Sequence, residues 1–426
     1  MKKFITLLFI FLFVHSFCLY ADAAESFDDD PMDIGHKKSF GIGERLFEIG
    51  IMNSNINFAN SFLSINEVLQ DVVVIDIDKL SDGFKFNLGL NVSPFYFTFK
   101  SPKGWGFGLS TNAEAIGILG LSGKMLTLSQ AVKDNSDIGG ALFGSTTINA
   151  FFNIQKFKVS VNPSLFYTLA YITPSPKSES ALLYTFDTSD DQTKMCIDYN
   201  IRLYTGFPMG GDNDDYGLTS KPGLDLSVGV QYQLAKELGI SKILPFLDFD
   251  ISLNLIHVPL FASSITDYTN IAGQFGSYDK PITFFNNADG DDFFSSFETS
   301  GNEPTYEKAE IKVSRPFKMI LRADWRPLLG AKLLTISPVF GFSYNSLYSV
   351  PTDWEYGLNA CLNIANFLLV KAGMNYTDRM YINSIGIALN LRAFEIDVGA
   401  DIRSQTIAQS WTGGGLGINF GLKFGW

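Results

Sequence analysis

Residues 157–171 read FKVSVNPSLFYTLAY, and this stretch decides the fold. Every odd position in it is apolar or aromatic, whereas the even positions begin with a lysine, two serines and an asparagine. Side chains of a β-strand alternate between two faces, so this pattern predicts a strand with one apolar and one polar face. The stretch is also long, because a membrane-crossing strand needs ~9–11 residues and a typical globular strand has ~5–6.

The same alternation recurs along the chain and gives the fold class. It extends over residues 195–203, 224–234, 247–255, 317–325, 354–364 and 394–402, and several of the polar faces carry full charges. Two architectures fit: a soluble β-sandwich with its apolar face inward, or an antiparallel transmembrane β-barrel with its apolar face outward. The strand lengths favour the all-β transmembrane barrel.

The connections between these runs support the barrel, because short and long joints alternate. The joints at 155–156, 365–366 and 392–393 are tight, while those at 114–140 and 404–414 are long. Outer-membrane barrels have this rhythm of short periplasmic turns and long outer loops. We count about sixteen strands, with fourteen as the alternative, and expect an even number. The segment 53–82 is compatible with a loop, a helix or a strand.

The N-terminus predicts export from the cytoplasm. Lysines at positions 2 and 3 precede an apolar run over 4–14, and an Ala-x-Ala cleavage pattern follows at 21–23. We therefore expect a signal peptide at 1–23, an N-terminal periplasmic segment at 24–39 and the barrel at 40–426, with a long external loop at 259–315. The predicted location is the outer membrane of a diderm bacterium.

The C-terminus is the most specific feature. Apolar side chains from Leu416 to Trp426 alternate with glycine, asparagine and lysine, and the sequence given stops on the aromatic residue. This resembles the terminal strand of bacterial outer-membrane β-barrels, in which the last aromatic residue is part of the signal that the barrel-assembly machinery reads. The resemblance implies Phe424 and Trp426 as the assembly signal, and that machinery and outer-membrane lipid as partners.

Composition excludes several function classes. The net charge of −12 repels phosphate backbones, so no nucleic-acid partner is expected. Three histidines and three cysteines in 426 residues are too few for a His/Cys metal cluster or a catalytic constellation. We expect no enzyme and no cofactor. His257 has a serine and an asparagine close by in the sequence, at positions 252 and 254. In the alternating pattern it falls on the same face as Leu253 and Leu255, which predicts that its side chain faces lipid.

The polar faces of the strands predict the lining of the lumen, because a charge that faces lipid at the midplane would cost ~2–4 kcal/mol for each Arg or Lys. These charged side chains either line an open pore or pair with one another inside a plugged barrel. The predicted lining residues are Asp198, Arg202, Asp225, Asp248, Asp250, Lys318, Arg322, Glu395, Asp397 and Asp401.

The connection 259–315 combines many acids with six phenylalanines. A solvated loop gains nothing by exposing six aromatic rings. We therefore predict a lid or constriction at the barrel mouth, or a surface that binds a hydrophobic solute or partner. The residues are Phe275, Phe284, Phe285, Phe293, Phe294 and Phe297.

A signal peptide, a large barrel, this Phe-rich segment and an Asn-rich stretch at 53–66 together resemble the long-chain fatty-acid transporter (FadL-type) barrels. The resemblance implies transport of hydrophobic compounds across the outer membrane. That family's Asn-Pro-Ala motif is absent, since the chain has Ala59-Asn60-Ser61, so no ligand residues are transferred. The predicted function is passive passage of small solutes, porin-like or hydrophobic. The alternative is a surface adhesin or structural barrel that displays acidic, Phe-rich loops.

Replacing Phe424 and Trp426 with alanine should reduce barrel assembly far more than the same change at Phe394 and Ile396. The terminal strand must be recognised and must close the barrel, because an open edge is not viable in lipid. The amount of folded protein in outer-membrane fractions measures the effect. Equal assembly of the two double variants would contradict this role.

Overall fold

The computed structural model describes most of the chain beyond residue 46, together with two short segments before it. The described residues are 38–39, 43–44, 47–60, 84–101, 103–121, 133–154, 156–174, 182–187, 194–207, 218–232, 234, 248–277, 298–301, 305–327, 333–348, 350–364, 367–391, 393–407, 409–411 and 414–425. The predicted signal peptide and Trp426 lie outside them.

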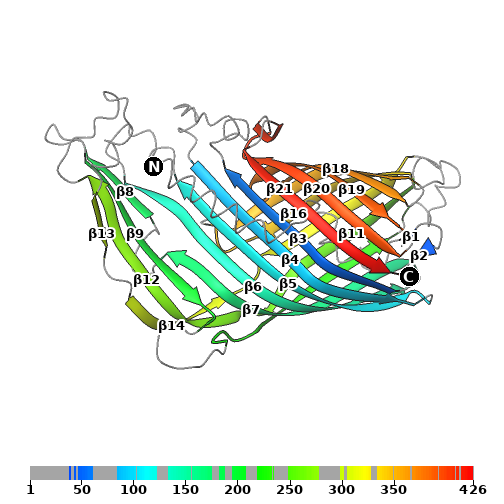
Figure 1. Cartoon of the computed structure of the whole chain (residues 1–426), viewed down its shortest axis with the longest axis horizontal. Helices are drawn as coiled ribbons and strands as arrows, with labels where there is room; N and C mark the ends of the chain where they lie inside the picture. The colour runs from blue at the N-terminus through cyan, green and yellow to red at the C-terminus, as the bar shows by residue number, and fades with distance from the viewer. Residues whose placement is uncertain are drawn as a thin grey trace.

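Fourteen antiparallel strands of the described chain form a closed ring (Figure 1). The ring closes at two places that decide the topology: β7 pairs with β10 over ten positions, and β21 lies beside β3, where Gly425 pairs with Glu48. The strands, in ring order, are β3 (Phe47–Asn60), β4 (Phe84–Lys100), β5 (Trp105–Leu121), β6 (Lys133–Ile154), β7 (Phe157–Pro174), β10 (Gly223–Tyr232), β11 (Asp248–Phe261), β15 (Phe317–Arg326), β16 (Leu334–Tyr344), β17 (Thr352–Ile364), β18 (Leu368–Thr377), β19 (Met380–Asn390), β20 (Phe394–Ser404) and β21 (Gly415–Gly425).

The predicted all-β antiparallel barrel is confirmed, and the alternative count of fourteen strands is right. The count of sixteen was wrong because two apolar runs that alternate correctly do not belong to the ring. The runs at 181–188 and 193–207 form β8 (Leu182–Asp187) and β9 (Lys194–Thr205), which lie beyond the end of the ring. Alternation with a period of two residues identifies a strand, but it does not show whether the strand crosses the membrane or lies outside it.

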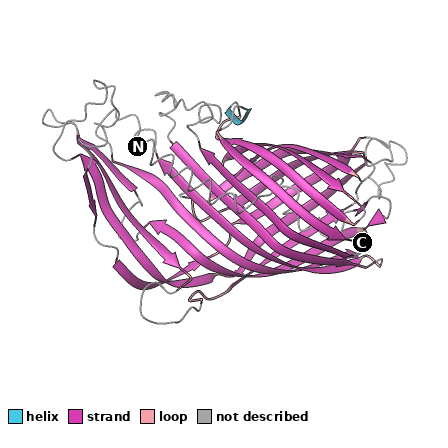
Figure 2. Ribbon diagram, in the orientation of Figure 1, coloured by secondary structure: helices cyan, strands magenta, loops and turns pink. Residues whose placement is uncertain are grey.

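Beyond the ring, a sheet that we call the extension makes one side of the barrel taller (Figures 1 and 2). Its remaining strands are β12 (Ser263–Ser277), β13 (Glu298–Gly301) and β14 (Thr305–Val313). β9 pairs with β7 and β12, and β12 pairs with β14, so β9, β12 and β14 continue the ring positions of β10, β11 and β15. Side chains at most positions of β14 are exposed, including Glu307, Lys308, Glu310 and Lys312, which places this strand in water.

The extension corrects the prediction of one long loop at 259–315. Most of the described part of that segment is strand, with β12 directly following β11 after Ala262. Ser263 and Ser264 interrupt the alternation of apolar and polar residues, so the sequence pattern did not reveal this strand. The first ring strand, β3, is described over Phe47–Asn60, and the predicted barrel start at residue 40 lies outside the described residues.

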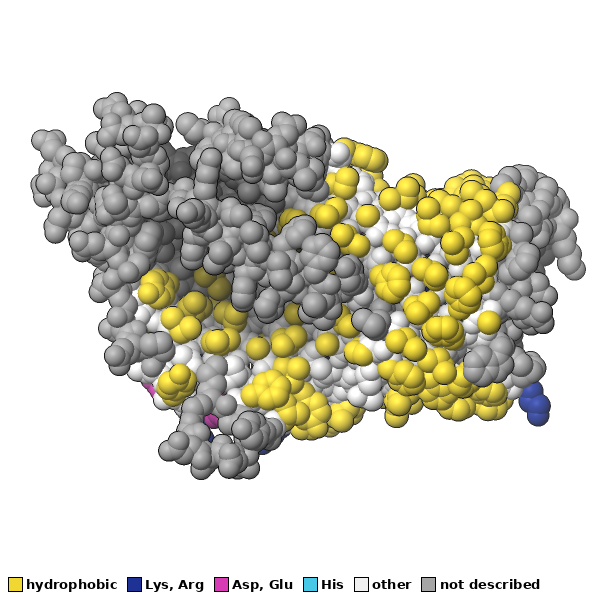
Figure 3. Space-filling view, viewed as in Figure 1, with side chains coloured by type: hydrophobic (Ala, Val, Ile, Leu, Met, Phe, Trp, Pro, Cys, Tyr) yellow, Lys and Arg dark blue, Asp and Glu magenta, His cyan; other side chains and the backbone are white. Residues whose placement is uncertain are grey.

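Apolar side chains cover much of the outer face of the ring (Figure 3), and the exposed aromatic residues among them form two belts. One belt lies at the end of the ring where β5 starts and β15 ends and includes exposed Trp105 and Trp325; the other lies where β17 starts and includes Trp354 and Tyr356. Between the belts the exposed side chains are aliphatic, as at Ile385 and Ile418. This outside pattern is that of a barrel in a lipid bilayer.

The opposite face of each ring strand points to the interior and is polar. In β20, Glu395, Asp397 and Asp401 are buried, whereas Val398 between them is 48% exposed. The register preserves this alternation across neighbouring strands, since Asp397 pairs with Gly421 and Val398 with Phe420. Outside the strands, one short 3-10 helix, η3 (Gln409–Trp411), is described, and β1 (Lys38–Ser39) pairs with β2 (Gly43–Glu44). Among the described residues, no helix is long and apolar enough to cross a membrane.

The closed ring predicts resistance to detergent. The refolded chain should migrate faster on a gel before boiling than after it, because a closed hydrogen-bonded ladder stays compact until heat opens it. Recovery of the protein from the soluble periplasm, with no change of mobility on heating, would contradict the barrel.

Candidate functional site

The barrel interior is the candidate site, and its charges are organised as ion pairs. Each predicted lining residue of the ring has an opposite charge within 4 Å. In every pair, only one of the two residues belongs to the predicted set. The pairs are Asp225 with Arg315 at 2.7 Å, Asp250 with Arg326 at 2.6 Å, Asp248 with Arg326 at 3.5 Å, Lys318 with Glu355 at 3.3 Å, Arg322 with Asp324 at 2.7 Å, Glu395 with Lys423 at 3.5 Å, Asp397 with Lys371 at 3.0 Å and Asp401 with Arg403 at 2.6 Å.

Most of these interior charges are buried, although the Asp248 side chain is 39% exposed. Asp401 is 1% exposed, Asp397 is 3% exposed and Lys423 is 3% exposed. A wide water-filled bore would leave such side chains hydrated. Instead, each buried charge is paired with an opposite charge. Removing one member of a pair would leave the other buried without a partner. The interior is therefore a network of paired charges.

Two predicted lining residues, Asp198 and Arg202, lie outside the ring. Both belong to β9 in the extension. The Arg202 guanidinium lies over the Tyr268 ring at 4.3 Å and donates to the Tyr204 hydroxyl at 3.4 Å. In the same region, Tyr268 donates to Glu307, and this hydrogen bond raises the pKa of the tyrosine.

The ring and the extension meet at a boundary that we call the seam. There β9, β12 and β14 of the extension lie next to the ends of the ring strands β10, β11 and β15. The seam is closed by direct contact between β7 and β12: the Ser263 hydroxyl accepts from the Thr168 amide at 3.0 Å and donates to the Lys221 carbonyl at 2.8 Å. Gly223 makes the close approach feasible, because a Cβ there would lie 2.4 Å from the Phe166 ring and 2.5 Å from the Ser263 nitrogen.

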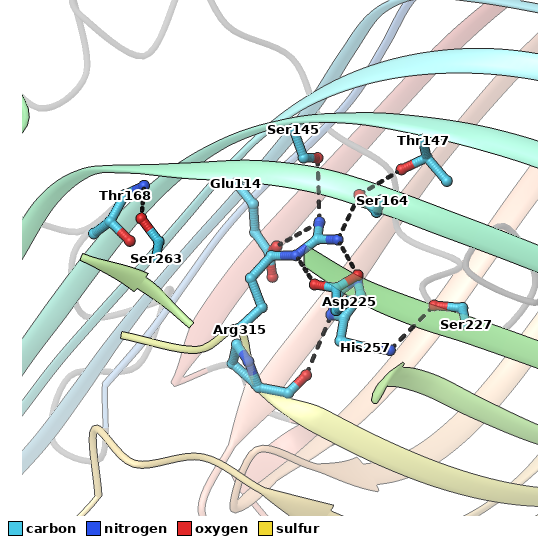
Figure 4. Close-up of polar contacts among 11 residues, drawn as sticks. Glu114, Ser145, Thr147, Ser164, Thr168, Asp225, Ser227, His257, Ser263 and Arg315 are labelled. Atoms are coloured by element: carbon cyan, nitrogen blue, oxygen red, sulfur yellow. Dashed lines mark hydrogen bonds and ion pairs between the residues drawn. The ribbon is translucent and has the colours of Figure 1, made fainter. Parts of the chain in front are cut away.

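Arg315 is the centre of the seam (Figure 4). Its side chain is 3% exposed and makes two hydrogen bonds with the Asp225 carboxylate, at 2.7 and 2.8 Å. It also donates to Ser164 at 2.7 Å and to Ser145 at 3.1 Å, and it lies 4.0 Å from the Glu114 carboxylate. One guanidinium thus joins the strand break before β15 to β10, β7, β6 and β5.

His257 lies at this seam and not on the lipid face, so its predicted place was wrong. A bulge between Leu226 and Val228 of β10 puts an extra residue into β11, and His257 adopts a φ of 52°. The ring Nδ1 lies 3.2 Å from the Pro316 carbonyl oxygen and the backbone amide donates to Ser227 (Figure 4). Parity fails here because a bulge shifts the alternation by one residue.

A loop from one wall of the barrel crosses its outer mouth to the opposite wall. This segment joins β16 to β17 and is described at 345–348 and 350–351; we call it the crossing loop. The Tyr348 hydroxyl accepts a hydrogen bond from Asn87 of β4 at 3.3 Å, and a Cβ at Gly139 of β6 would lie 3.1 Å from the Leu347 carbonyl oxygen. β4 and β6 lie across the ring from β16 and β17, so the loop spans the mouth.

Tyr348 is fixed by the neighbouring β18–β19 turn. Its hydroxyl donates to the Asp378 carbonyl at 3.4 Å, and the Arg379 guanidinium lies 4.3 Å from the tyrosine ring centroid. Arg379 also donates to the Val350 carbonyl, and Lys318 pairs with the Asp378 carboxylate at 3.4 Å. Burial raises the pKa of Tyr348 above its ordinary value, so its hydroxyl remains a neutral donor.

The predicted lid of phenylalanines stays a prediction. Phe275 belongs to β12, while Phe284, Phe285, Phe293, Phe294 and Phe297 lie outside the described residues. In the described part of the chain, no three His, Cys, Asp or Glu side chains are grouped so as to hold a metal ion, and Cys361 is not in a disulfide.

Sequence reasoning missed Arg315, Asn87 and the crossing loop. Arg315 carried one signal, because Pro316 follows it and proline breaks a strand ladder where a new apolar alternation begins. The crossing loop carried none, since the short segment between β16 and β17 has the composition of any outer loop.

Comparison with known proteins gives a likeness of overall form. No family model and no curated protein matches the sequence. Among solved structures, the Pseudomonas putida toluene transporter TodX superposes with a TM-score of 0.47 and 10% identity, over 96% of this chain and 95% of that one. The CymD monoaromatic hydrocarbon channel gives 0.41 and 9%, over 95% and 92%. The translocator domain of the autotransporter NalP from Neisseria meningitidis gives 0.34 and 5%, over 91% of each.

Replacing Arg315 with methionine should destabilise the barrel by about 3–5 kcal/mol, because the buried Asp225 carboxylate loses its partner. Adding Asp225→Asn should recover much of that loss. Urea unfolding in lipid vesicles measures both. The control is Lys308→Met: Lys308 is 85% exposed and 3.7 Å from Asp267, so its pair should contribute about 0–1 kcal/mol. Equal losses for the two single variants would contradict the central role of Arg315.

Proposed function

We propose that this chain is an outer-membrane channel for the passive passage of small solutes, with a narrow interior and an outer mouth closed by the crossing loop. The observation that carries the proposal is the loop itself: 345–351 reaches Asn87 on the opposite wall. A barrel that only displayed surface loops would gain nothing from a segment held across its lumen.

The paired interior supports a narrow route rather than a wide pore. We propose that Asp225, Asp250, Lys318, Asp397 and Asp401 line this route together with their partners. Serine and asparagine side chains between the charges, such as those at positions 252 and 254 of β11, also face the interior and are buried. Solutes would pass by exchanging water for these fixed polar groups, which favours small molecules over bulky ones.

The crossing loop can be tested because its ends already meet. The Asn345 amide donates to the Pro351 carbonyl at 2.7 Å, so removing 346–350 leaves a turn that needs little rearrangement. We expect the shortened protein to fold and to conduct several-fold more current in planar bilayers, because the mouth loses its obstruction.

Tyr348→Ala should give a smaller increase of conductance than the deletion, because the ring is lost but the backbone stays. The matched control is Trp411→Ala, which removes an aromatic side chain that is 67% exposed. Its conductance should equal that of the unchanged protein. If neither the deletion nor the unchanged protein conducts, the channel proposal fails and a display role takes its place.

A further inference from the structure

A cleft of about 460 Å³ opens beside the crossing loop at the outer rim of the ring. Its lining comes from β4, the crossing loop with the start of β17, the end of β18 with the turn after it, and the residues that follow β20. The lining residues are Lys85, Val350, Thr352, Asp353, Tyr376, Arg379, Gln405 and Thr406. Its volume falls within the ~300–1,000 Å³ of small-molecule sites.

The charges of the cleft differ from those of the whole protein. Two cations, Lys85 and Arg379, line the cleft with one acid, Asp353, although the chain as a whole carries a net charge of −12. The lining therefore holds one more cationic than acidic side chain, which favours an anionic group over a cationic one.

Two buried polar atoms next to the cleft have no hydrogen-bond partner within the described residues. One is the Asp353 Oδ2 atom, an acceptor, and the other is the Gln405 Nε2 atom, a donor. The second carboxylate oxygen of Asp353 accepts from the Trp354 amide at 2.9 Å, which fixes the side chain. A buried polar group without a partner costs about 1–3 kcal/mol, so a ligand that supplies both partners gains binding energy.

From these observations we infer that the cleft binds a small carboxylate that also carries a hydroxyl or amino donor. The carboxylate would face Arg379, Lys85 and the Gln405 amide, and the donor would face Asp353. The Tyr376 ring gives an apolar part of the solute a surface to pack on. This inference rests on the proposed channel, for which the cleft would be the outer binding site.

The two unpartnered atoms lie beneath the cleft surface, so the solute reaches them by moving a side chain at the rim. Lys85 is exposed at this rim. Arg379 serves both the cleft and the crossing loop, since it donates to the Val350 carbonyl and covers the Tyr348 ring. A carboxylate at Arg379 would therefore lie next to the segment that closes the mouth.

Titration calorimetry of the refolded mature chain in detergent tests the inference, with mandelate as the probe. Mandelate carries a carboxylate, a hydroxyl donor and a ring. Mandelamide lacks the charge and phenylacetate lacks the donor. We expect a one-site isotherm for mandelate and roughly tenfold weaker binding of each analogue. Absence of mandelate binding, or equal binding of all three compounds, would overturn the inference.

Gln405→Glu should weaken mandelate binding roughly tenfold, because a second carboxylate replaces the amide donor. The matched control, Thr305→Glu, adds the same charge at an exposed position of β14 and should leave binding unchanged. Should Gln405→Glu fail to fold, Lys85→Gln at the exposed rim gives a second test and should weaken binding severalfold. Unaltered binding in the folded cleft variants would overturn the inference.

The outcomes separate this inference from the channel itself. Conductance in planar bilayers without mandelate binding would leave the channel in place and remove the cleft as a carboxylate site. Mandelate binding that Gln405→Glu weakens, in a protein that never conducts, would support the cleft and remove the channel.

Discussion

Every feature of this protein depends on one constraint, which is that a backbone inside lipid must satisfy all of its hydrogen bonds within the protein. A sheet meets this constraint only when its two edges pair, and here β21 meets β3 while β7 meets β10. Closure then separates the side chains into an outer and an inner set. The outer set contacts lipid and is apolar, so the polar and charged residues of the ring are confined to the interior.

Confinement of charge explains the interior pairs and the seam. A carboxylate such as Asp225 at 1% exposure is tolerable only with a partner, and Arg315 supplies it from the break before β15. The same break lets β14 continue past the ring, because Pro316 cannot donate to a ladder. The extension and the ring are thus joined where backbone pairing is interrupted, and the side chains of Arg315 and Ser263 connect the strands there.

The sequence predicted the closed barrel, the polar interior and the fourteen-strand alternative, because period two reports directly on which face a residue occupies. It did not separate β8 and β9 from ring strands, since alternation continues in a sheet above the membrane. The alternation also placed His257 on the wrong face, because one extra residue in a bulge reverses which face the following side chains occupy. Contacts between distant segments, such as Asn87 with Tyr348, produce no repeating pattern in the sequence. For this reason neither the crossing loop nor the cleft at Arg379 could be predicted.

The central claim is that this chain is an inside-out barrel, and neighbouring residues of β20 test it most directly. In a variant without native cysteines, an environment-sensitive fluorophore would be attached to a cysteine at position 397 or at position 398. Asp397 is 3% exposed and Val398 is 48% exposed. In such a barrel, a lipid-borne quencher should quench the fluorophore strongly at position 398 and weakly at position 397. Equal quenching at both positions, or quenching at 398 by a water-soluble quencher alone, would contradict the claim.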